Sequence, residues 1–354
     1  MKRLFLKIAS FVYGAGVGLR NMMFDMGLLR STEYDIPVIC VGNITAGGTG
    51  KTPVVEMLVA YFSALYDVAV LSRGYGRVTR GYREVGVGDR CCDVGDEPLQ
   101  VKRKFPAAKV IVCGKRRYAI ERIRREHPEV NLIIMDDGFQ HRYVKPFINI
   151  ITVDATRPFE EDSLLPVGML RDRISSLHRA HYFLVTKCPD TMTPMDARIQ
   201  RDKLVQAPYQ SLYFTRIAED DVRPVFDGVR GAVKFGSEVV AMCGIGNSDV
   251  FIDGLRRRFD LVHTIVFDDH YRYRTKDLAE IGGVLERYPG AVVIMTEKDA
   301  VKFFNSSKVP QQMRQRLFYE SIRVEFIDGL EEEFLGRLDN DLKQHNNGTY
   351  IRGC

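Results

Sequence analysis

The chain has 354 residues and a formal net charge of +5, and its hydrophobic and charged fractions are 45% and 27%. These fractions are typical of a globular protein, and the length suffices for two cored domains. The mild positive charge falls short of the excess found in nucleic-acid-binding proteins, so we expect no nucleic-acid partner; an anionic lipid surface or a phosphate-rich substrate would suit it. Seven scattered cysteines without metal-binding spacing indicate free thiols in a reducing compartment.

Residues 1–30 combine basic and apolar side chains. An uncharged run from Ile8 to Leu19 lies between Lys7 and Arg20. This run is too short to span a bilayer, because a membrane-spanning helix needs roughly 20 residues. We therefore predict a membrane-associating helix that lies in the membrane interface and directs its basic side chains to the headgroups. Packing of this helix on the core of the protein is the alternative.

A strand, a glycine-rich loop and a helix are predicted in succession near the start of the chain. An apolar run ends at Gly42, and apolar residues at helical spacing begin after Pro53. Between them lies a variant P-loop, in which Thr45 stands where the strict motif has glycine. The predicted nucleotide contacts are Thr45, Gly47, Gly48, Thr49, Gly50, Lys51 and Thr52. Lys51 would reach the β- and γ-phosphates and Thr52 would ligate Mg²⁺, unless the segment is a glycine-rich turn that binds nothing.

Apolar runs and helical patterns alternate as far as about residue 190. The predicted strands are 36–42, 67–72, 108–113, 131–136, 147–153 and 181–187. Their continuous apolar character predicts an α/β fold in which helices flank a mostly parallel, P-loop NTPase-like sheet. Two long segments, 73–107 and 154–180, interrupt the alternation. Long loops after strands are where such folds build their sites.

A second alternating series begins near residue 210. It predicts strands over 238–243, 261–267, 291–296 and 321–327 and helices over 247–258, 275–287, 298–304 and 329–338. The polar, proline-containing stretch 188–210 is predicted to be a linker, and the polar residues 339–354 are expected to fray. The predicted parts are therefore the helix over 1–30, a P-loop domain over 31–205 and a smaller α/β domain over 206–354.

Paired carboxylates follow the apolar strand that ends at Met135. In a P-loop fold such a strand lies beside the P-loop strand, so Asp136 and Asp137 would face Mg²⁺ directly or through water. A strand end followed by an Asp-Gly turn is the alternative.

Further acid, base and cation candidates lie at element ends. Asp96 and Glu97 occupy the first turn of a predicted helix. The helix dipole by itself would favour acids there, but in a protein that deprotonates a hydroxyl group Asp96 becomes a candidate general base. Asp269 and His270 end a strand of the second series, where they could close over the first domain. Arg116 begins a helix and offers a cation to a phosphate, unless it belongs to a solvated basic face.

Taken together, these motifs resemble those of the tetraacyldisaccharide 4'-kinase family of lipid A biosynthesis. The stretches that carry the resemblance are 42–53, 71–77, 95–98, 136–141, 154–159, 168–172, 268–271 and 296–302. They occur in the family's order along nearly the whole chain. The run Asp136-Asp137-Gly138-Phe139-Gln140-His141 and the unusual P-loop are highly specific. Small departures occur at Met169, Asp172 and Tyr271.

The resemblance implies transfer of the ATP γ-phosphate to the 4'-hydroxyl of a tetraacyl glucosamine disaccharide 1-phosphate, with ATP and Mg²⁺ as cofactors. It implies a Gram-negative bacterium and a peripheral or monotopic enzyme at the cytoplasmic face of the inner membrane. The domain over 206–354 would close the active-site cleft of the kinase domain over 31–205.

The resemblance also implies a role for each motif residue. The implied catalytic residues are Asp96, His270, Asp269 and Lys51, the magnesium residues are Thr52, Glu97, Asp136 and Asp137, and the phosphate or substrate contacts are Arg73, Tyr75, Arg116, His141 and Arg171. These roles suit phosphoryl transfer, which depends mainly on alignment and charge neutralisation. A positioned carboxylate helps at the transition state because the pKa of a sugar hydroxyl lies far above neutral pH.

Two other classes of function are weighed against this one. A P-loop GTPase or ATPase switch that handles membrane-protein or metal cargo has a similar loop, but would hydrolyse nucleotide without an acceptor. Residues 186–189 match the guanine-reading motif only in part, which counts against guanine specificity. A non-catalytic nucleotide-sensing scaffold would have little use for the acids at 96, 136 and 137.

Overall fold

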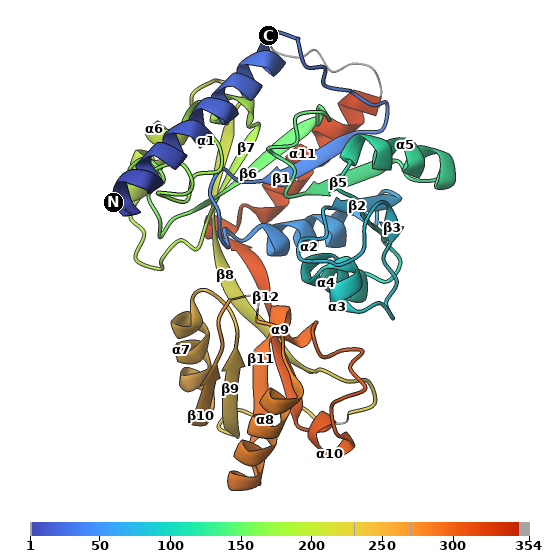
Figure 1. Cartoon of the computed structure of the whole chain (residues 1–354), viewed down its shortest axis with the longest axis vertical. Coiled ribbons are helices and arrows are strands. Elements are labelled where there is room, and N and C mark those ends of the chain that lie inside the picture. The colour runs from blue at the N-terminus through green and yellow to red at the C-terminus, as the bar shows by residue number, and fades with distance from the viewer. Residues whose placement is uncertain (1, 230, 270, 347–354) are drawn as a thin grey trace.

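The computed structural model describes residues 2–229, 231–269 and 271–346. Figure 1 shows a larger and a smaller part connected by two long strands. The larger part contains β1 (Val38–Gly42), β2 (Val68–Ser72), β3 (Arg83–Glu84), β4 (Lys109–Val112), β5 (Leu132–Asp136), β6 (Ile148–Asp154) and β7 (Tyr182–Thr186). Its helices are α1 (Lys2–Asp25), α2 (Lys51–Phe62), α3 (Cys91–Val94), α4 (Asp96–Lys104), α5 (Arg116–Glu126), the 3-10 helix η1 (Ile174–Arg179) and α6 (Pro194–Leu204).

The smaller part has the same alternating character. It contains β9 (Glu238–Cys243), α7 (Ser248–Arg258), β10 (Asp260–Val266), α8 (Thr275–Arg287), β11 (Val292–Thr296), α9 (Glu297–Ala300) and α10 (Gln311–Arg314). The two connecting strands are β8 (Ser211–Pro224) and β12 (Leu317–Phe326), after which come η2 (Ile327–Gly329) and the last helix, α11 (Glu331–Asn346).

The described strands form one twelve-stranded sheet in the order β10-β9-β11-β12-β8-β7-β6-β1-β5-β2-β4-β3. β1 lies between β5 and β6 and is parallel to both. β8 pairs in parallel with β7 through its first residues and antiparallel with β12 through the rest. The two parts are therefore halves of one sheet, and β8 and β12 form the connection between them (Figure 1).

The central strands of the larger part are buried on both faces. Alternate residues of β1 point to opposite sides, so that Ile39 packs in one cluster with α2 while Cys40 packs in another with α5. This explains the continuous apolar runs in the sequence, because a parallel strand covered by helices on both faces has no solvent-facing side. The P-loop NTPase-like α/β fold predicted from the sequence is confirmed.

The last helix returns to the larger part. Phe334, Leu338 and Leu342 of α11 are fully buried in the same cluster as Phe62 of α2. The expected fraying over 339–354 is therefore wrong for residues 339–346, and residues 347–354 lie outside the described part. The predicted division into 31–205 and 206–354 stays a prediction, and any division has to accommodate this return of the chain.

One prediction about the middle of the chain is wrong, and one strand there was not predicted. The supposed linker over 188–210 contains α6, which begins with a capping box in which the Thr193 hydroxyl accepts from the Asp196 amide and the Asp196 carboxylate accepts from that of Thr193. Because α6 buries only Leu204, it has no apolar stripe that a hydrophobic period could reveal. The long strand β8 was not predicted, because its second half is charged and pairs with β12 outside the central core.

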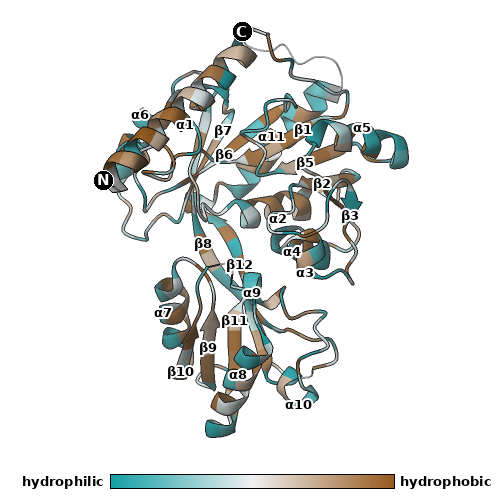
Figure 2. Cartoon of the chain, in the orientation of Figure 1, coloured by the Kyte–Doolittle hydropathy of each residue, from teal (hydrophilic) through white to brown (hydrophobic). Residues whose placement is uncertain are grey.

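The predicted N-terminal helix exists and has two different faces. One face contacts the body of the protein, where the Phe24 ring meets that of Tyr143 at 5.1 Å between centroids. Large apolar side chains are exposed along the rest of α1, among them Phe5 and Phe11, which are 72% and 78% exposed, and Figure 2 shows the hydrophobic colouring of this helix. No helix within the described residues is long and apolar enough to cross a membrane.

Candidate active site

The P-loop joins β1 to α2. Gly50 is the N-cap of α2 and adopts the left-handed conformation, with φ 77°, and Gly47 has φ 101°. Glycine allows both conformations without the steric cost that a Cβ atom imposes. α2 then begins at Lys51, so that its unpaired N-terminal amides face the loop and favour an anion there. The structure therefore has the strand–loop–helix geometry that the motif predicts.

Hydroxyl groups of three threonines form hydrogen bonds at the P-loop. Thr49 is 3% exposed. Its hydroxyl accepts from the Asn43 amide at 2.8 Å and lies 2.8 Å from the Thr152 hydroxyl. The Thr186 hydroxyl donates to the Thr49 carbonyl at 3.0 Å. Thr49 was predicted as a nucleotide contact, whereas Thr152 and Thr186 were not predicted as part of the site, because isolated threonines in strands carry no pattern of their own.

Lys187 and Asp154 form a second missed element of the site. The Lys187 ammonium donates to the Gly48 carbonyl and pairs with Asp154 at 2.7 Å. Lys187 has φ 56°, an uncommon conformation for a residue with a Cβ atom. Such residues concentrate at functional sites because the surrounding structure has to hold them there. The 186–189 stretch therefore holds the P-loop in place through hydrogen bonds.

Asp137 lies at the centre of the polar groups around the loop. Its carboxylate accepts from Arg171 at 2.9 and 3.1 Å and approaches the Lys51 ammonium at 3.5 Å. Burial alone would raise the pKa of Asp137, but Lys51 and Arg171 outweigh burial and hold that pKa below its ordinary value. Asp137 is therefore ionised at neutral pH.

Asp136 is in a different environment, although it is the neighbouring residue. It is 5% exposed at the end of β5, where one carboxylate oxygen accepts from the Ser72 hydroxyl at 3.0 Å. Its other oxygen, Oδ1, is buried without a hydrogen-bond partner among the described residues. Burial, with repulsion from Glu97 and Asp137, raises the pKa of Asp136 to about 7.

Asp96 and Glu97 begin α4, directly after Gly95. Burial raises the pKa of Glu97, against the attraction of Lys51 and of Lys298 from the smaller part. The charges of Lys51 and Asp137 act on Glu97, and that of Glu97 acts on Asp136, so the N-terminus of α4 lies near the P-loop. The structure therefore brings the predicted acids of two separate segments, 96–97 and 136–137, to one place.

Arg116 contacts Asp136, and His141 lies near Arg116. Arg116 is 2% exposed, and its guanidinium donates to the carbonyls of Cys113 at 2.7 Å and Asp136 at 3.3 Å. Burial and the nearby arginines lower the pKa of His141 to about 4, so its imidazole is neutral at pH 7. Contact of either residue with a phosphate stays a prediction, whereas the support that Arg116 gives to the backbone of Asp136 is a finding.

Arg73 and Tyr75 lie at the end of β2 and are exposed. The smaller part approaches this loop, since the Arg272 guanidinium donates to the Gly76 carbonyl at 3.2 Å. Asp269 pairs with Lys298 at 3.0 Å. The predicted catalytic residue His270 lies outside the described residues, so its place in the site stays a prediction.

The oxygen ligands and cations around the P-loop fit a magnesium–nucleotide complex. Within the described part of the chain, no three His, Cys, Asp or Glu side chains form a complete metal site. Mg²⁺ in kinase sites, however, takes one or two carboxylates and completes its shell with phosphate oxygens and water. The Oδ1 atom of Asp136, which has no hydrogen-bond partner among the described residues, is a carboxylate oxygen that could serve as such a ligand.

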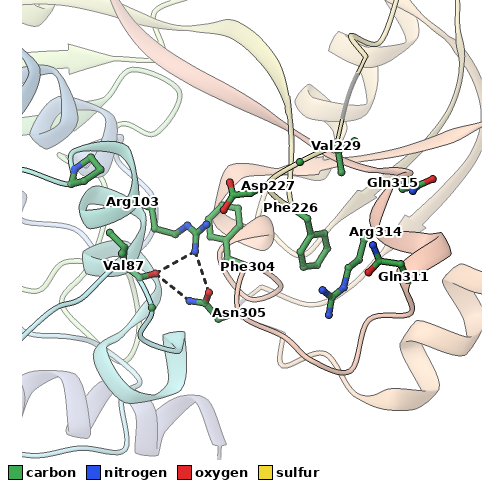
Figure 3. A pocket seen from close by; sticks show the side chains of 13 residues that line it. Val87, Arg103, Phe226, Asp227, Val229, Phe304, Asn305, Gln311, Arg314 and Gln315 are labelled. Carbon is green, nitrogen blue, oxygen red and sulfur yellow. Dashed lines mark hydrogen bonds between the residues drawn. The ribbon is translucent and has the colours of Figure 1, made fainter.

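A cavity of about 600 Å³ lies between the two parts, apart from the P-loop. Figure 3 shows Arg103 of α4 beside Asn305 of the smaller part. Both side chains donate to the Val87 carbonyl, at 3.3 and 3.2 Å, and the Arg103 guanidinium lies over the Phe304 ring. None of the predicted site residues lines this cavity, so we assign it no part in the reaction.

Comparison with known proteins agrees with this geometry. A family model described as tetraacyldisaccharide-1-P 4'-kinase matches residues 2–342. The tetraacyldisaccharide 4'-kinase of Porphyromonas gingivalis is 38% identical over 341 residues, which cover 94% of this chain and 95% of that protein. The enzyme of the same name from Parabacteroides distasonis is 37% identical over 350 residues, with 95% of both chains covered.

The similarity extends to three dimensions. A crystal structure of the "apo" form of LpxK from Aquifex aeolicus in complex with ATP has a TM-score of 0.73 and 25% sequence identity, and the match covers 97% of this chain and 99% of that one. The resemblance found in the motifs is thus confirmed by the sequence relatives and by the fold. With a P-loop, converging carboxylates and this end-to-end similarity, the chain belongs to the tetraacyldisaccharide-1-P 4'-kinase family.

Proposed function

We propose that this chain transfers the γ-phosphate of ATP to the 4'-hydroxyl of a tetraacyl glucosamine disaccharide 1-phosphate, a precursor of lipid A. The observation that carries the proposal is the meeting of Lys51 and Arg171 at Asp137, beside the N-terminus of α2. Two cations, a carboxylate and a helix N-terminus together suit the terminal phosphate of a nucleotide. Family membership supports the choice of acceptor.

The P-loop residues would hold the triphosphate. Backbone amides of the loop would donate to the phosphates. Lys51 would exchange part of its attraction to Asp137 for the β- and γ-phosphate oxygens. Arg171 would do the same for the transferred group. Alignment of this kind supplies most of the catalysis in phosphoryl transfer, because the reaction needs little covalent chemistry from the protein.

Thr52 and Asp136 would hold Mg²⁺, with Glu97 and Asp137 acting directly or through water. When bound, the ion would neutralise charge on the phosphate oxygens. A cation beside Asp136 also favours the ionised carboxylate, which burial and the neighbouring acids disfavour. Asp136 would therefore lose its proton as the magnesium–nucleotide complex binds.

Asp96 would accept the proton of the sugar hydroxyl. It lies in the first turn of α4, before Glu97, and would have to approach the hydroxyl within hydrogen-bond distance. Asp269 and His270 would support this step from the smaller part, and Arg73 and Tyr75 would contact the substrate.

The acceptor is a lipid, and α1 would bring the enzyme to it. The exposed apolar side chains of α1 would enter the membrane interface, since apolar burial contributes about 25 cal/mol per Å². We propose a peripheral or monotopic position at the cytoplasmic face of the inner membrane. Nucleic acid has no part in this proposal.

The test is incubation of the protein with γ-labelled ATP, Mg²⁺ and a lipid A disaccharide monophosphate. We expect a labelled bisphosphorylated lipid, whose formation requires both the nucleotide and the lipid. Release of labelled inorganic phosphate at the same rate with and without the lipid would instead support the nucleotide-hydrolysing switch. A protein that binds ATP and produces neither would support the nucleotide sensor.

A further inference from the structure

The inner face of α1 contacts the segment that carries Arg171. Three hydrogen bonds connect residues more than 150 positions apart in the sequence. They run from the Tyr13 hydroxyl to the Arg171 carbonyl (2.9 Å), from the Asn21 amide to the Asp172 carboxylate (2.8 Å) and from the Arg173 guanidinium to the Gly14 carbonyl (3.0 Å). Three consecutive residues, Arg171 to Arg173, are thus held by one helix.

Asp172 fixes this segment in one orientation. It is 2% exposed, and besides Asn21 it accepts from the Arg173 amide at 2.9 Å and from Arg179 at 3.1 Å. The Arg179 guanidinium in turn lies over the ring of Phe139, which follows the paired carboxylates in the sequence. A buried carboxylate with three donors has little freedom to rotate, because each lost hydrogen bond would leave a buried polar group unpaired.

The same segment is bonded to the P-loop. The backbone of Arg171 donates to the Ile44 carbonyl at 2.7 Å, and the Ala46 amide donates to the Met169 carbonyl at 2.6 Å. The Arg171 side chain adds bonds to the Thr45 carbonyl at 3.1 Å and to the Asn43 side chain at 2.7 Å. The position of this segment therefore determines where the first residues of the P-loop lie, and also where the Asp137 carboxylate is held.

A second route connects α1 to the loop without passing through Arg171. The Arg20 guanidinium donates to the Gln140 carbonyl at 2.5 Å, and the Gln140 amide donates to the Asn43 carbonyl at 2.6 Å. Both routes end at the first residues after β1.

We propose that Tyr13, Asn21 and Asp172 are positioning residues for phosphoryl transfer, which act by holding Arg171 against Asp137 and the P-loop. This inference rests on the proposed function. α1 thus has two roles on two faces: its outer face carries exposed Phe5 and Phe11, and its inner face aligns the phosphate site. Displacement of a positioning group by about 1 Å can lower the rate of a reaction by two orders of magnitude.

The test uses Tyr13→Phe and Asn21→Ala in the full chain, with the acceptor dissolved in detergent so that a lipid surface does not limit the rate. Tyr209→Phe is the matched control, because the Tyr209 hydroxyl also donates to a backbone carbonyl, that of His178, at 2.7 Å. We expect kcat to fall about tenfold in both α1 variants, with the KM for ATP and the melting temperature close to wild type. The control should keep its kcat.

Combination with Arg171→Ala separates positioning from general damage. If Tyr13 acts through Arg171, Tyr13→Phe should lower kcat little further once Arg171 is alanine, whereas independent effects multiply. Any of three results would overturn the inference. They are an unchanged kcat in both single variants, a kcat in the double variant that is lowered by the product of the two single effects, and a loss of kcat in the control as large as that in the α1 variants. A wild-type protein that forms no bisphosphorylated lipid would contradict the proposed function instead.

Discussion

Arg171 and Asp137 form a two-pronged ion pair, with nitrogen–oxygen distances of 2.9 and 3.1 Å. The two residues come from segments that are 34 positions apart and that sequence analysis treated as separate motifs. Because Lys51 approaches the same carboxylate, Asp137 keeps two cations in place before a phosphate arrives.

Arg171→Lys should lower the rate of phosphate transfer by about ten- to a hundredfold. Lysine keeps the charge, but its ammonium group cannot bind both oxygens of Asp137 in one plane and also reach the Thr45 carbonyl. Steady-state kinetics with labelled ATP would measure the loss. Arg201→Lys, on the exposed surface of α6, is the control. Equal rates for the two variants would contradict the role of the two-pronged ion pair between Arg171 and Asp137.

Asp96→Ala should nearly abolish turnover while ATP still binds. The variant removes the proposed proton acceptor and leaves the P-loop intact. Product formation and ATP binding by calorimetry would be measured together, with Asp93→Ala as a nearby control. A variant that keeps more than about a tenth of the wild-type rate has lost under 1.4 kcal/mol, and Asp96 would then not be the base.

Asp136→Asn should make the nucleotide-free protein more stable at high pH. The pKa of Asp136 is raised from 3.8 to about 7, so the folded protein keeps a proton that the unfolded chain releases between these values. Stability of the wild type at this site therefore falls as the pH rises from about 4 to about 7. At pH 8 we expect the variant to melt on the order of 5 °C higher, with the difference shrinking toward pH 4.

Thermal melts across this pH range would test the linkage, with Asp253→Asn on the exposed surface of α7 as the control. A difference between Asp136→Asn and wild type that does not change with pH would contradict it. The same variant should transfer phosphate poorly, because it has lost a proposed magnesium donor.

Magnesium and ATP should stabilise the protein together more than either does alone. The described carboxylates form no complete metal site by themselves, so the ion needs the phosphates of the nucleotide as further donors. Melting temperatures with ATP, Mg²⁺, both, and both followed by chelator would measure this coupling. Equal stabilisation by ATP with and without Mg²⁺, or no loss on chelation, would argue against a magnesium–nucleotide complex.

Replacement of Phe5 and Phe11 by serine should weaken binding to anionic vesicles. Both rings are exposed on α1, so the substitutions remove apolar surface without disturbing the hydrogen bonds of the inner face. Vesicle flotation would measure the effect, and Phe235→Ser is the matched control because Phe235 is 81% exposed in the smaller part. Deletion of residues 1–25 should weaken flotation too, although it also removes the contacts to Arg171. Unchanged flotation of the double variant would exclude α1 as the membrane contact.

Much of the fold and the chemistry could be predicted from local signals. The buried parallel strands are continuous apolar runs, and the P-loop is a short motif whose glycines, Lys51 and Thr52 serve one local geometry. The kinase family followed from the order of such motifs and is confirmed by relatives along the whole chain. Local patterns failed at α6, which has no apolar stripe, and at β8, whose charged half is a strand only because β12 pairs with it.

By itself, then, the sequence determined the P-loop, the strand that ends in Asp136 and Asp137, and the class of reaction, because each depends on residues that are neighbours in the chain. Only the tertiary structure decided which residues surround that loop. It brought Arg171 to Asp137, Lys187 to Asp154, and α1 to the segment of Arg171. These contacts join distant segments through single hydrogen bonds and ion pairs, and the packing of the sheet and its helices, rather than any spacing in the chain, creates them.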